Sequence, residues 1–315
     1  MKKKLFSILF ALALSISVAG CNSTAEQPAK NSAAATSAAE VTEKTEATEA
    51  ETEATAESTA PETSAAESSA VELSSSGDWA YIEDKNEMII GITYFEPMNY
   101  LDNSGELTGF ETEFAEAVCE ILGVTPKFQE ISWSAKEIEL DAKNIDCIWN
   151  GMTITPDRAA NMSISVPYMQ NKQVLVVKSE NAAAYATSID GLTIVAEVES
   201  AGEGVVQEED FFQSATYIPV DTQAKALMEV ASGTADGCVI DYVTSIGMIG
   251  EGTDYTGLVV VEECAFAEEE YGIAMRKSDS EFTAKINDAI KQLIDNGKLM
   301  EIAVKYELDN LLITG

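Results

Sequence analysis

"IDCIWNGMTITPDR", residues 145–158, is the stretch that decides the fold of this chain. It begins as a short apolar run, which is typical of a buried strand, and continues into a polar loop. Its last four residues are typical of a helix start, because Thr is a good N-cap and Pro is favoured in the first turn. A strand that opens through a polar loop into a helix indicates an α/β sheet.

Strands and helices alternate on either side of this stretch. Apolar runs predict strands at 88–93, 125–132 and 145–153. A helix is expected at 110–122, because large apolar residues recur on one face and Gly123 can end it. That face carries Phe110, Phe114, Ala117, Val118, Ile121 and Leu122. A polar helix at 134–144 completes a strand–helix order that predicts an α/β class with a mostly parallel sheet.

A second set of elements follows. We expect strands at 172–178, 192–198, 235–242 and 271–277. An amphipathic helix is predicted at 222–233, with an inward face of Ala224, Leu227, Met228 and Ala231. Two more helices are expected within 280–306, with Ser280 as the N-cap. Strands in both halves end in polar loops, so two lobes that face one another would form a cleft beyond their strand ends.

The N-terminus has the pattern of a secretory signal. Lysines at positions 2–4 precede an apolar run that ends in small residues directly before Cys21. The sequence Val-Ala-Gly-Cys at 18–21 resembles the lipobox of bacterial lipoproteins, in which the cysteine is acylated. We therefore expect a signal peptide at 1–20 and a lipid anchor on Cys21, at the outer face of the cytoplasmic membrane. The alternative is an ordinary cleaved signal that happens to precede a cysteine.

Residues 21–77 differ in composition from the rest of the chain. They consist mainly of Ala, Thr, Ser and Glu, so they cannot bury enough apolar surface to offset the ordering of the backbone. We expect a disordered tether. Removal of residues 1–20 takes away three lysines and changes the net charge from −35 to −38. A chain this acidic is not expected to bind nucleic acid or to adhere directly to anionic lipid.

The histidine and cysteine contents exclude several kinds of chemistry. The chain has no histidine, which excludes His-dependent triads and histidine metal sites. After Cys21 the cysteines are Cys119, Cys147, Cys238 and Cys264, and their spacing fits no metal motif. Export permits disulfides, but the first three lie in apolar runs, so we favour small buried hydrophobes. We expect neither a metal nor a cofactor.

Seven blocks, taken in order, resemble the polar amino-acid-binding family of extracellular solute-binding proteins, the receptors of ABC importers. They are "GITYFEPMNY", "GELTGFETEFAEAVCEILGV", "IDCIWNGMTITPDR", "VPYMQNKQVLVVK", "GTADGCVIDY", "YGIAMRK" and "INDAIKQLIDNGKLMEIAVKY". The resemblance implies a two-lobed, periplasmic-binding-protein-like fold of type II with a hinge. It places lobe 1 at 78–170 and 271–315, and lobe 2 at 171–270. It also implies a non-enzymatic monomer that binds a free amino acid and docks on the transmembrane subunits of an ABC permease.

A free amino acid presents a carboxylate, and the decisive stretch contains groups that suit one. Arg158 offers a planar, permanently charged fork of N–H donors. Thr153 adds a hydroxyl, and Gly151 lets a backbone N–H approach closely. The helix start itself favours an anion. The resemblance assigns the carboxylate to Arg158; the alternative is a surface ion pair with Asp157 or a glutamate.

The resemblance implies the remaining site residues. Asp241, at the end of a strand, would accept from the ammonium; the alternative is a solvated loop acid. Trp133 and Phe95 would line the walls, where an aromatic near an ammonium gains about 0.5–2 kcal/mol, or they would pack within the lobe. Further candidates are Asn150, the Ser200 hydroxyl and the Ala201 N–H. Glu197 and Glu199, next to that loop, would either contact a cationic or hydrogen-bonding side chain or be solvated.

Two other functions remain open from the sequence. Some proteins of this fold are dehydratases, and a carboxylic acid in a closed cleft can act as a general acid, for which Glu197 is the candidate. The chain would also suit a ligand-sensing domain. It lacks a GxxxxGK[ST] phosphate loop, so ATP hydrolysis would belong to a separate subunit.

Overall fold

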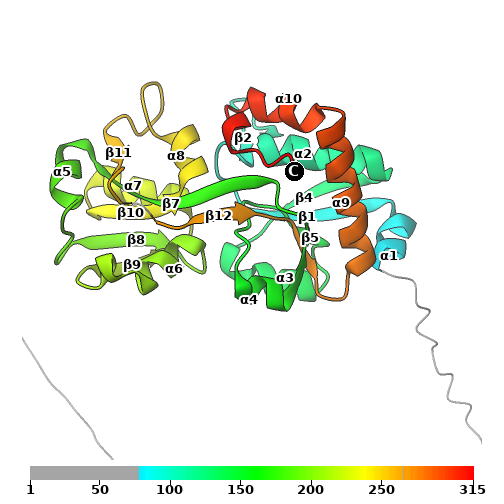
Figure 1. Ribbon diagram of the computed structural model, residues 1–315, viewed down its shortest axis with the longest axis horizontal. Coiled ribbons are helices and arrows are strands. Elements are labelled where there is room, and N and C mark those ends of the chain that lie inside the picture. The colour runs from blue at the N-terminus through cyan, green and yellow to red at the C-terminus, as the bar shows by residue number, and fades with distance from the viewer. Residues whose placement is uncertain (1–77, 265) are drawn as a thin grey trace, which may run out of the picture. The chain divides into compact units, whose positions relative to one another are not determined.

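The computed structural model describes residues 78–264 and 266–315, which belong to one compact unit (Figure 1). The signal peptide, the acylated Cys21 and the tether at 21–77 lie outside the described residues, so these three expectations stay predictions. Among the described residues, no helix combines the length and the apolar character of a membrane span.

The first lobe is built on a five-stranded sheet with the order β4–β1–β5–β13–β6. Its strands are β1 (Glu87–Ile92), β4 (Thr125–Glu130), β5 (Cys147–Ile148), β6 (Met162–Ile164) and β13 (Ala274–Arg276). Strand β1 is parallel to β4 and β5, whereas β13 is antiparallel to β5 and β6. The stretch 145–158 therefore supplies the central strand of the sheet, β5, and its loop opens at the carboxyl ends of β1 and β5.

The second lobe is built on a sheet with the order β11–β7–β10–β8–β9. Its strands are β7 (Met169–Lys178), β8 (Thr193–Glu197), β9 (Thr216–Val220), β10 (Gly237–Asp241) and β11 (Leu258–Val260). Strands β10, β8 and β9 are parallel neighbours, and β7 pairs with β10 and β11 in the antiparallel sense. Glu197 and Asp241 are the last residues of the parallel strands β8 and β10, so both lie at one edge of this sheet.

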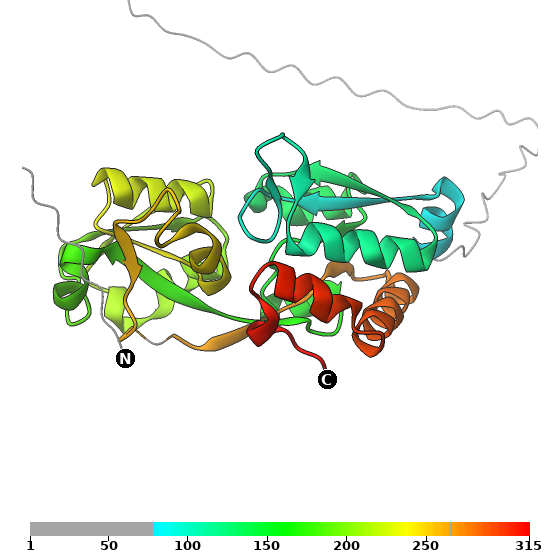
Figure 2. The same cartoon turned by 90° about the horizontal axis from the view of Figure 1, so that it is seen from above.

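Helices cover the sheets, and their bounds follow the expected alternation with the strands. They are α1 (Asp78–Lys85), α2 (Phe110–Leu122), α3 (Lys136–Asp141), α4 (Pro156–Asn161), α5 (Ala182–Tyr185), α6 (Ala201–Glu208), α7 (Gln223–Ser232), α8 (Tyr242–Met248), α9 (Ser280–Asp295) and α10 (Lys298–Lys305). The short strands β2 (Tyr100–Leu101) and β3 (Leu107–Thr108) form a separate hairpin. In the first lobe α2, α9 and α10 pack against one another (Figure 2).

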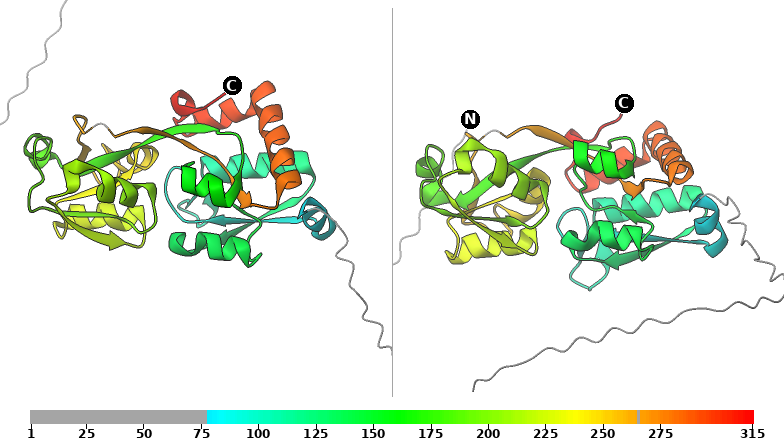
Figure 3. Two further views of the ribbon diagram at one scale, coloured as in Figure 1. Left: turned by 60° about the horizontal axis from the view of Figure 1, so that its bottom comes forward. Right: turned by 90° about the horizontal axis from the view of Figure 1, so that it is seen from below.

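Two strands run side by side between the lobes (Figure 3). The first part of β7 pairs with β12 (Glu268–Tyr271), and the remainder of β7 pairs inside the second sheet. This strand pair connects the two lobes, as expected of a hinge. The predicted two-lobed α/β fold is confirmed. The lobe boundaries expected at 170/171 and 270/271 fall within β7 and β12, and we keep them as a proposal.

The expected helix at 110–122 is confirmed, and Gly123 ends it with a left-handed φ of 72°. The expected inward face of α7 is wrong in part, because Met228 is 53% exposed and Ala231 is also exposed. The buried face consists of Gln223, Ala226, Leu227 and Val230. The helix is turned so that Gln223 can reach Asp241, a polar contact that an apolar pattern does not reveal.

The start of the helix at 280 also differs from the expectation. Ser280 is the first helical residue, and Asp279 occupies the N-cap position without a capping hydrogen bond from its side chain. The Asp279 carboxylate forms a buried ion pair with Arg276 instead, with an Nε–Oδ2 distance of 2.9 Å. The helix therefore begins where this ion pair fixes the backbone.

Candidate functional site

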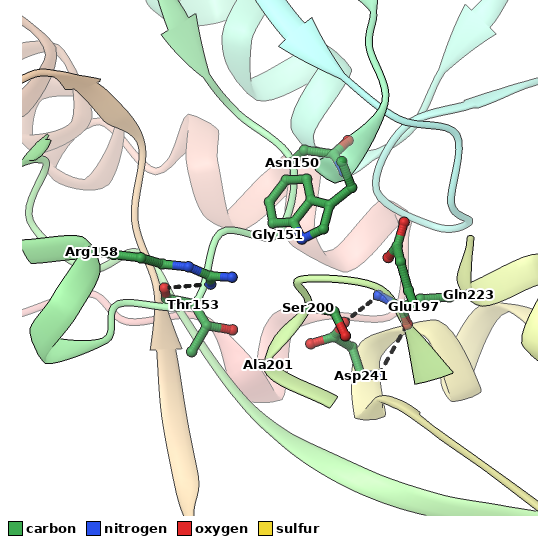
Figure 4. A pocket seen from close by; sticks show the side chains of 10 residues that line it. Asn150, Gly151, Thr153, Arg158, Glu197, Ser200, Ala201, Gln223 and Asp241 are labelled. Carbon is green, nitrogen blue, oxygen red and sulfur yellow. Dashed lines mark hydrogen bonds between the residues drawn. The ribbon is translucent and has the colours of Figure 1, made fainter. Parts of the chain in front are cut away.

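A small cavity lies between the lobes (Figure 4). The first lobe supplies the loop after β5, the start of α4 and Trp133. The second lobe supplies the ends of β8 and β10 and the starts of α6 and α7. The lining residues are Trp133, Asn150, Gly151, Thr153, Arg158, Glu197, Ser200, Ala201, Gln223 and Asp241.

Eight of the nine residues expected from the sequence line this cavity, and Phe95 does not. Phe95 is only 5% exposed and belongs to the first-lobe core. Its backbone pairs with Asn99 in a tight turn, and its ring packs beneath Gly151. The expectation of Phe95 as a wall residue is therefore corrected, because it supports the floor of the cavity from below. The roles of the other eight in binding stay predictions.

Arg158 enters the cavity from the first turn of α4. Thr155 caps this helix by accepting a hydrogen bond from the Arg158 backbone N–H at 3.2 Å. The guanidinium donates to the carbonyl oxygens of Thr153 at 2.9 Å and Glu199 at 3.0 Å. Burial lowers the pKa of Arg158, and the Asp241 carboxylate acts in the opposite direction. The guanidinium thus makes hydrogen bonds in the cleft, and not an ion pair with Asp157.

Gly151 has a positive φ of 53°, and a Cβ there would approach the Phe95 ring to 2.6 Å. Only glycine fits this floor position. Its N–H donates to the Glu111 carboxylate at 2.8 Å, so this N–H already has a partner within the first lobe. Glu111 also accepts from Tyr168 and Asn99, and burial raises its pKa to about 7. No sequence pattern singled out Glu111, whose carboxylate holds the loop after β5 in place.

Asn150 is also engaged within the first lobe. Its Oδ1 accepts from the Thr93 N–H at 2.7 Å and from Asn99 at 3.1 Å, and its Nδ2 donates to the Thr93 hydroxyl at 2.6 Å. These hydrogen bonds fix the end of β5 against the end of β1. Asn150 therefore shapes the cavity wall with an amide that is already paired.

Asp241 is buried and accepts four hydrogen bonds from side chains. The donors are Asn171 at 2.6 Å, Tyr271 at 2.7 Å, Gln173 at 2.8 Å and Gln223. The alternative of a solvated loop acid is wrong. Two of the donors come from β7 and one from α7, so the carboxylate is fixed at the edge of the cavity by several elements.

Two charged residues near the cavity were not expected from the sequence. Glu269 of β12 accepts from Thr153 at 2.9 Å, from Asn171 and from Gln173, and burial raises its pKa to about 7. Lys136 is buried over the Trp133 ring, 4.7 Å from the centroid. Glu269 was recognisable in principle, because the two-residue period of a strand puts it on the face of Tyr271. Lys136 carried no such signal, since it lies in a helix of mixed polarity.

The backbone of Glu199 joins the two lobes. This residue has a left-handed φ of 58°. Its carbonyl oxygen accepts from three first-lobe side chains, namely Trp133 at 3.1 Å, Arg158 at 3.0 Å and Lys136 at 3.5 Å. We call this set the Glu199 carbonyl contact. It draws the loop after β8 toward the first lobe and closes one side of the cavity.

The loop after β8 leads into α6, whose start lines the cavity. The Ser200 hydroxyl caps this helix by accepting from the Glu203 N–H at 3.1 Å. Ala201 is the first helical residue, and first-turn N–H groups lack partners within a helix. This helix end therefore presents backbone donors and a positive partial charge toward the cavity.

Glu197 is the third charged residue of the lining. It is only 5% exposed. Burial raises its pKa to about 8, the Asp241 carboxylate acts in the same direction, and Lys136 acts against both. A carboxyl group in a closed cleft that changes its charge near neutral pH is unusual and marks a functional position.

The cysteines of the described residues are not part of the cavity. Cys119, Cys147 and Cys238 are buried with free thiols, which confirms them as small buried hydrophobes, and Cys264 is a free thiol that is partly exposed. Within residues 78–264 and 266–315, no group of Cys, Asp and Glu side chains has the geometry of a metal site.

The chain is similar to known proteins along most of its length. Residues 88–309 match the profile of the bacterial extracellular solute-binding proteins, family 3. The chain belongs to this family. It is 26% identical over 229 residues to the L-cystine-binding protein TcyJ of Escherichia coli, a match that covers 71% of this chain and 84% of that protein. Members of this family are extracytoplasmic, as the sequence predicted.

Two solved structures extend the comparison. An ABC uptake transporter substrate-binding protein from Streptococcus pneumoniae with bound histidine is 30% identical, with a TM-score of 0.66 over 74% of this chain and 96% of that one. The ancestral amino acid-binding protein AncCDT-1, a precursor of cyclohexadienyl dehydratase, is 27% identical, with a TM-score of 0.65 over 73% and 99%. The fold is that of type II periplasmic amino-acid-binding proteins.

Proposed function

We propose that this protein is the substrate-binding lipoprotein of an ABC importer, which captures a free amino acid between its lobes and delivers it to a membrane permease. One observation carries the proposal. Arg158 of the first lobe and Asp241 of the second lobe line the same cavity. A guanidinium and a carboxylate on opposite walls match the two charges of a zwitterion.

Each wall has a distinct part in this proposal. Arg158 binds the α-carboxylate, and the backbone donors at the start of α6, from Ala201 onward, supplement it. Asp241 accepts from the α-ammonium, for which its fixed orientation among four donors prepares it. The Trp133 ring covers the ligand from the first lobe.

Closure of the cleft couples ligand binding to transport. Arg158 and Asp241 belong to different lobes, so the ligand completes both contacts only when the lobes are together. A ligand that binds the closed form better than the open form shifts the population toward closure. The Glu199 carbonyl contact supports the same closed arrangement. A permease that recognises the closed form would then receive mainly loaded protein.

The anchor belongs to the proposal as well. The acylated Cys21 would hold the monomeric protein at the outer face of the cytoplasmic membrane, and the acidic tether would keep the lobes within reach of the permease. Mass spectrometry of the mature N-terminus tests this part, because a diacyl group on Cys21 has a mass that an unmodified cysteine lacks.

A second candidate is an enzyme of the same fold. It is favoured by the raised pKa of Glu197, which suits a general acid, and by the similarity to a precursor of a dehydratase. Incubation of the protein with prephenate-like acids distinguishes the two candidates. Turnover that disappears in Glu197→Gln would replace the transport proposal.

The direct test is a thermal-shift screen of the protein against the twenty amino acids and cystine. A ligand at 100 times its Kd adds about 2.7 kcal/mol, which corresponds to a rise in Tm of roughly 5–10 °C for a domain of this size. Arg158→Ala should abolish the shift for every ligand, and Arg158→Lys should weaken it, because Lys keeps the charge but lacks the fork. Lys291→Ala, at an exposed position, is the control. Unchanged binding by Arg158→Ala would contradict the assignment.

A further inference from the structure

The Glu197 carboxylate stands out among the charged groups of the cavity. It lies at the end of β8 and is 95% buried, yet no hydrogen-bond donor from residues 78–264 or 266–315 reaches it. Figure 4 shows hydrogen bonds from Gln223 to Asp241 and from Arg158 to Thr153, and none to Glu197. Buried carboxylates normally have such donors, so this group lacks its partner within the protein.

The charged groups around Glu197 come from four elements. Asp241 at the end of β10 and Arg158 of α4 line the same cavity. Lys136 of α3 is near enough to act on the Glu197 charge, and Glu269 of β12 shares donors with Asp241. Both of these outer charges have protein partners, because Lys136 forms an ion pair with Glu199 at 3.5 Å and Glu269 accepts from Thr153.

The charges that line the cavity are therefore one positive group, Arg158, and two negative groups, Asp241 and Glu197. A neutral amino acid supplies one carboxylate and one ammonium, which would pair with Arg158 and Asp241 and leave Glu197 buried and unpaired. An amino acid with a second cationic group complements all three charges. Removal of a charge from water is costly unless it is paired, so the second ligand is favoured over the first.

We propose that Glu197 determines specificity by pairing with a positively charged side chain, so that the ligand is a cationic amino acid with a guanidinium or ammonium group. This inference rests on the proposed function and narrows its substrate class. Such a contact is a charge-assisted hydrogen bond in a site without bulk water, which is strong enough to decide between ligands of equal size.

The protonation of Glu197 supports the geometry and gives a second observable. With a pKa of about 8, raised by burial and by Asp241, most of the Glu197 carboxyl groups carry a proton at pH 7 before a ligand binds. A cation binds to the ionised form, so binding releases protons at this pH. Deprotonation then favours binding, and the affinity for a cationic ligand should rise as the pH increases from 6 to 8.

The experiment is calorimetric titration of the full-length chain, kept in a mild detergent, with arginine and with citrulline. Citrulline has the same shape and the same α-groups, but its urea group is neutral. We expect arginine to bind roughly 10- to 100-fold more tightly than citrulline, with the ratio falling toward one in Glu197→Gln. Glu180→Gln, an exposed carboxylate on the same lobe, should keep the ratio of the unaltered protein. Lysine in place of arginine tests the ammonium form.

Titration at pH 7 in two buffers of different ionisation enthalpy counts the protons released. Release with arginine and none with citrulline is expected, and this measurement needs no variant, so the inference stays testable if Glu197→Gln fails to fold. Equal affinities for arginine and citrulline, or tighter binding of citrulline, would overturn the inference and leave the proposed function intact. Absence of binding by every amino acid would overturn both.

Discussion

At the scale of single residues, the site depends on carboxyl groups held in different states by their surroundings. Among residues 78–264 and 266–315, Asp241 accepts four hydrogen bonds from side chains, Glu111 accepts three hydrogen bonds, and the Glu197 carboxylate accepts none. Donors favour the ionised form, and burial without donors favours the neutral form. Carboxyl groups thus supply the proposed acceptor for an ammonium at Asp241, a support for the loop at Gly151 through Glu111, and at Glu197 a group without a donor among the described residues.

Glu111 gives a prediction on stability and pH. Burial raises its pKa from 4.5 to about 7, so the folded protein holds a proton that the unfolded chain has released between these pH values. The free energy of unfolding should therefore fall as the pH rises through this window, by up to about 3 kcal/mol from this group. Urea denaturation at pH 5 and pH 7.5 measures the change.

The matched variant for this measurement is Glu111→Gln, which cannot ionise. Its unfolding free energy should fall less between the two pH values than that of the unaltered protein. Glu83→Gln, in an exposed position of α1, should behave like the unaltered protein. An equal fall in Glu111→Gln would show that the pH dependence arises elsewhere, for example from the repulsion of the many surface acids.

At the scale of elements, the two lobes meet through the loop before α6 and through side chains of the 3₁₀ helix at Trp133–Ala135, of α3 and of α4. The Glu199 carbonyl contact takes donors from Trp133, Lys136 and Arg158. The ring of Trp133 also lies close to both cations, with the Lys136 Nζ 4.7 Å and the Arg158 guanidinium carbon 5.7 Å from its centroid. Trp133 therefore has both a stacking role and a donor role in closure.

The substitution Trp133→Phe separates these two roles. Phe keeps a ring but lacks the indole N–H, so the closed form should lose one hydrogen bond, about 1 kcal/mol. Ligand affinity should fall roughly fivefold for every amino acid, with little change in their ranking. Tyr94→Phe, at an exposed aromatic outside the cavity lining, is the control. Unchanged affinity in Trp133→Phe would exclude this contact from ligand-linked closure.

Local patterns in the sequence predicted most of these elements, and the resemblance to a known family pointed to eight of the residues around the cavity. The apolar period of α2 and the strand-to-helix pattern of 145–158 each depend on neighbours in the chain. Glu111 illustrates what such patterns omit, since it contacts Gly151 and Tyr168, which lie 40 and 57 positions away. Gln223 and Phe95 are also placed by contacts with residues distant in the chain. Gln223 lies inward and contacts Asp241, and the Phe95 ring packs against Gly151 below the cavity.

At the scale of the whole molecule, each lobe is built on one sheet. In the proposed function, the two lobes close around a ligand. Strands β7 and β12 connect the lobes, and their side chains Asn171, Gln173 and Tyr271 also hold Asp241. The acceptor proposed for the ammonium is thus fixed by the connecting strands themselves. Movement of the lobes about these strands would change the distance between Asp241 and Arg158, which links ligand binding to closure.

A crystal structure of the protein with a bound amino acid tests the central claim most directly. We expect the α-carboxylate to lie within hydrogen-bond distance of the Arg158 guanidinium. The α-ammonium should lie within hydrogen-bond distance of the Asp241 carboxylate, and both lobes should contact the ligand. A ligand that lies away from these two groups, or that contacts one lobe only in the closed form, would contradict it.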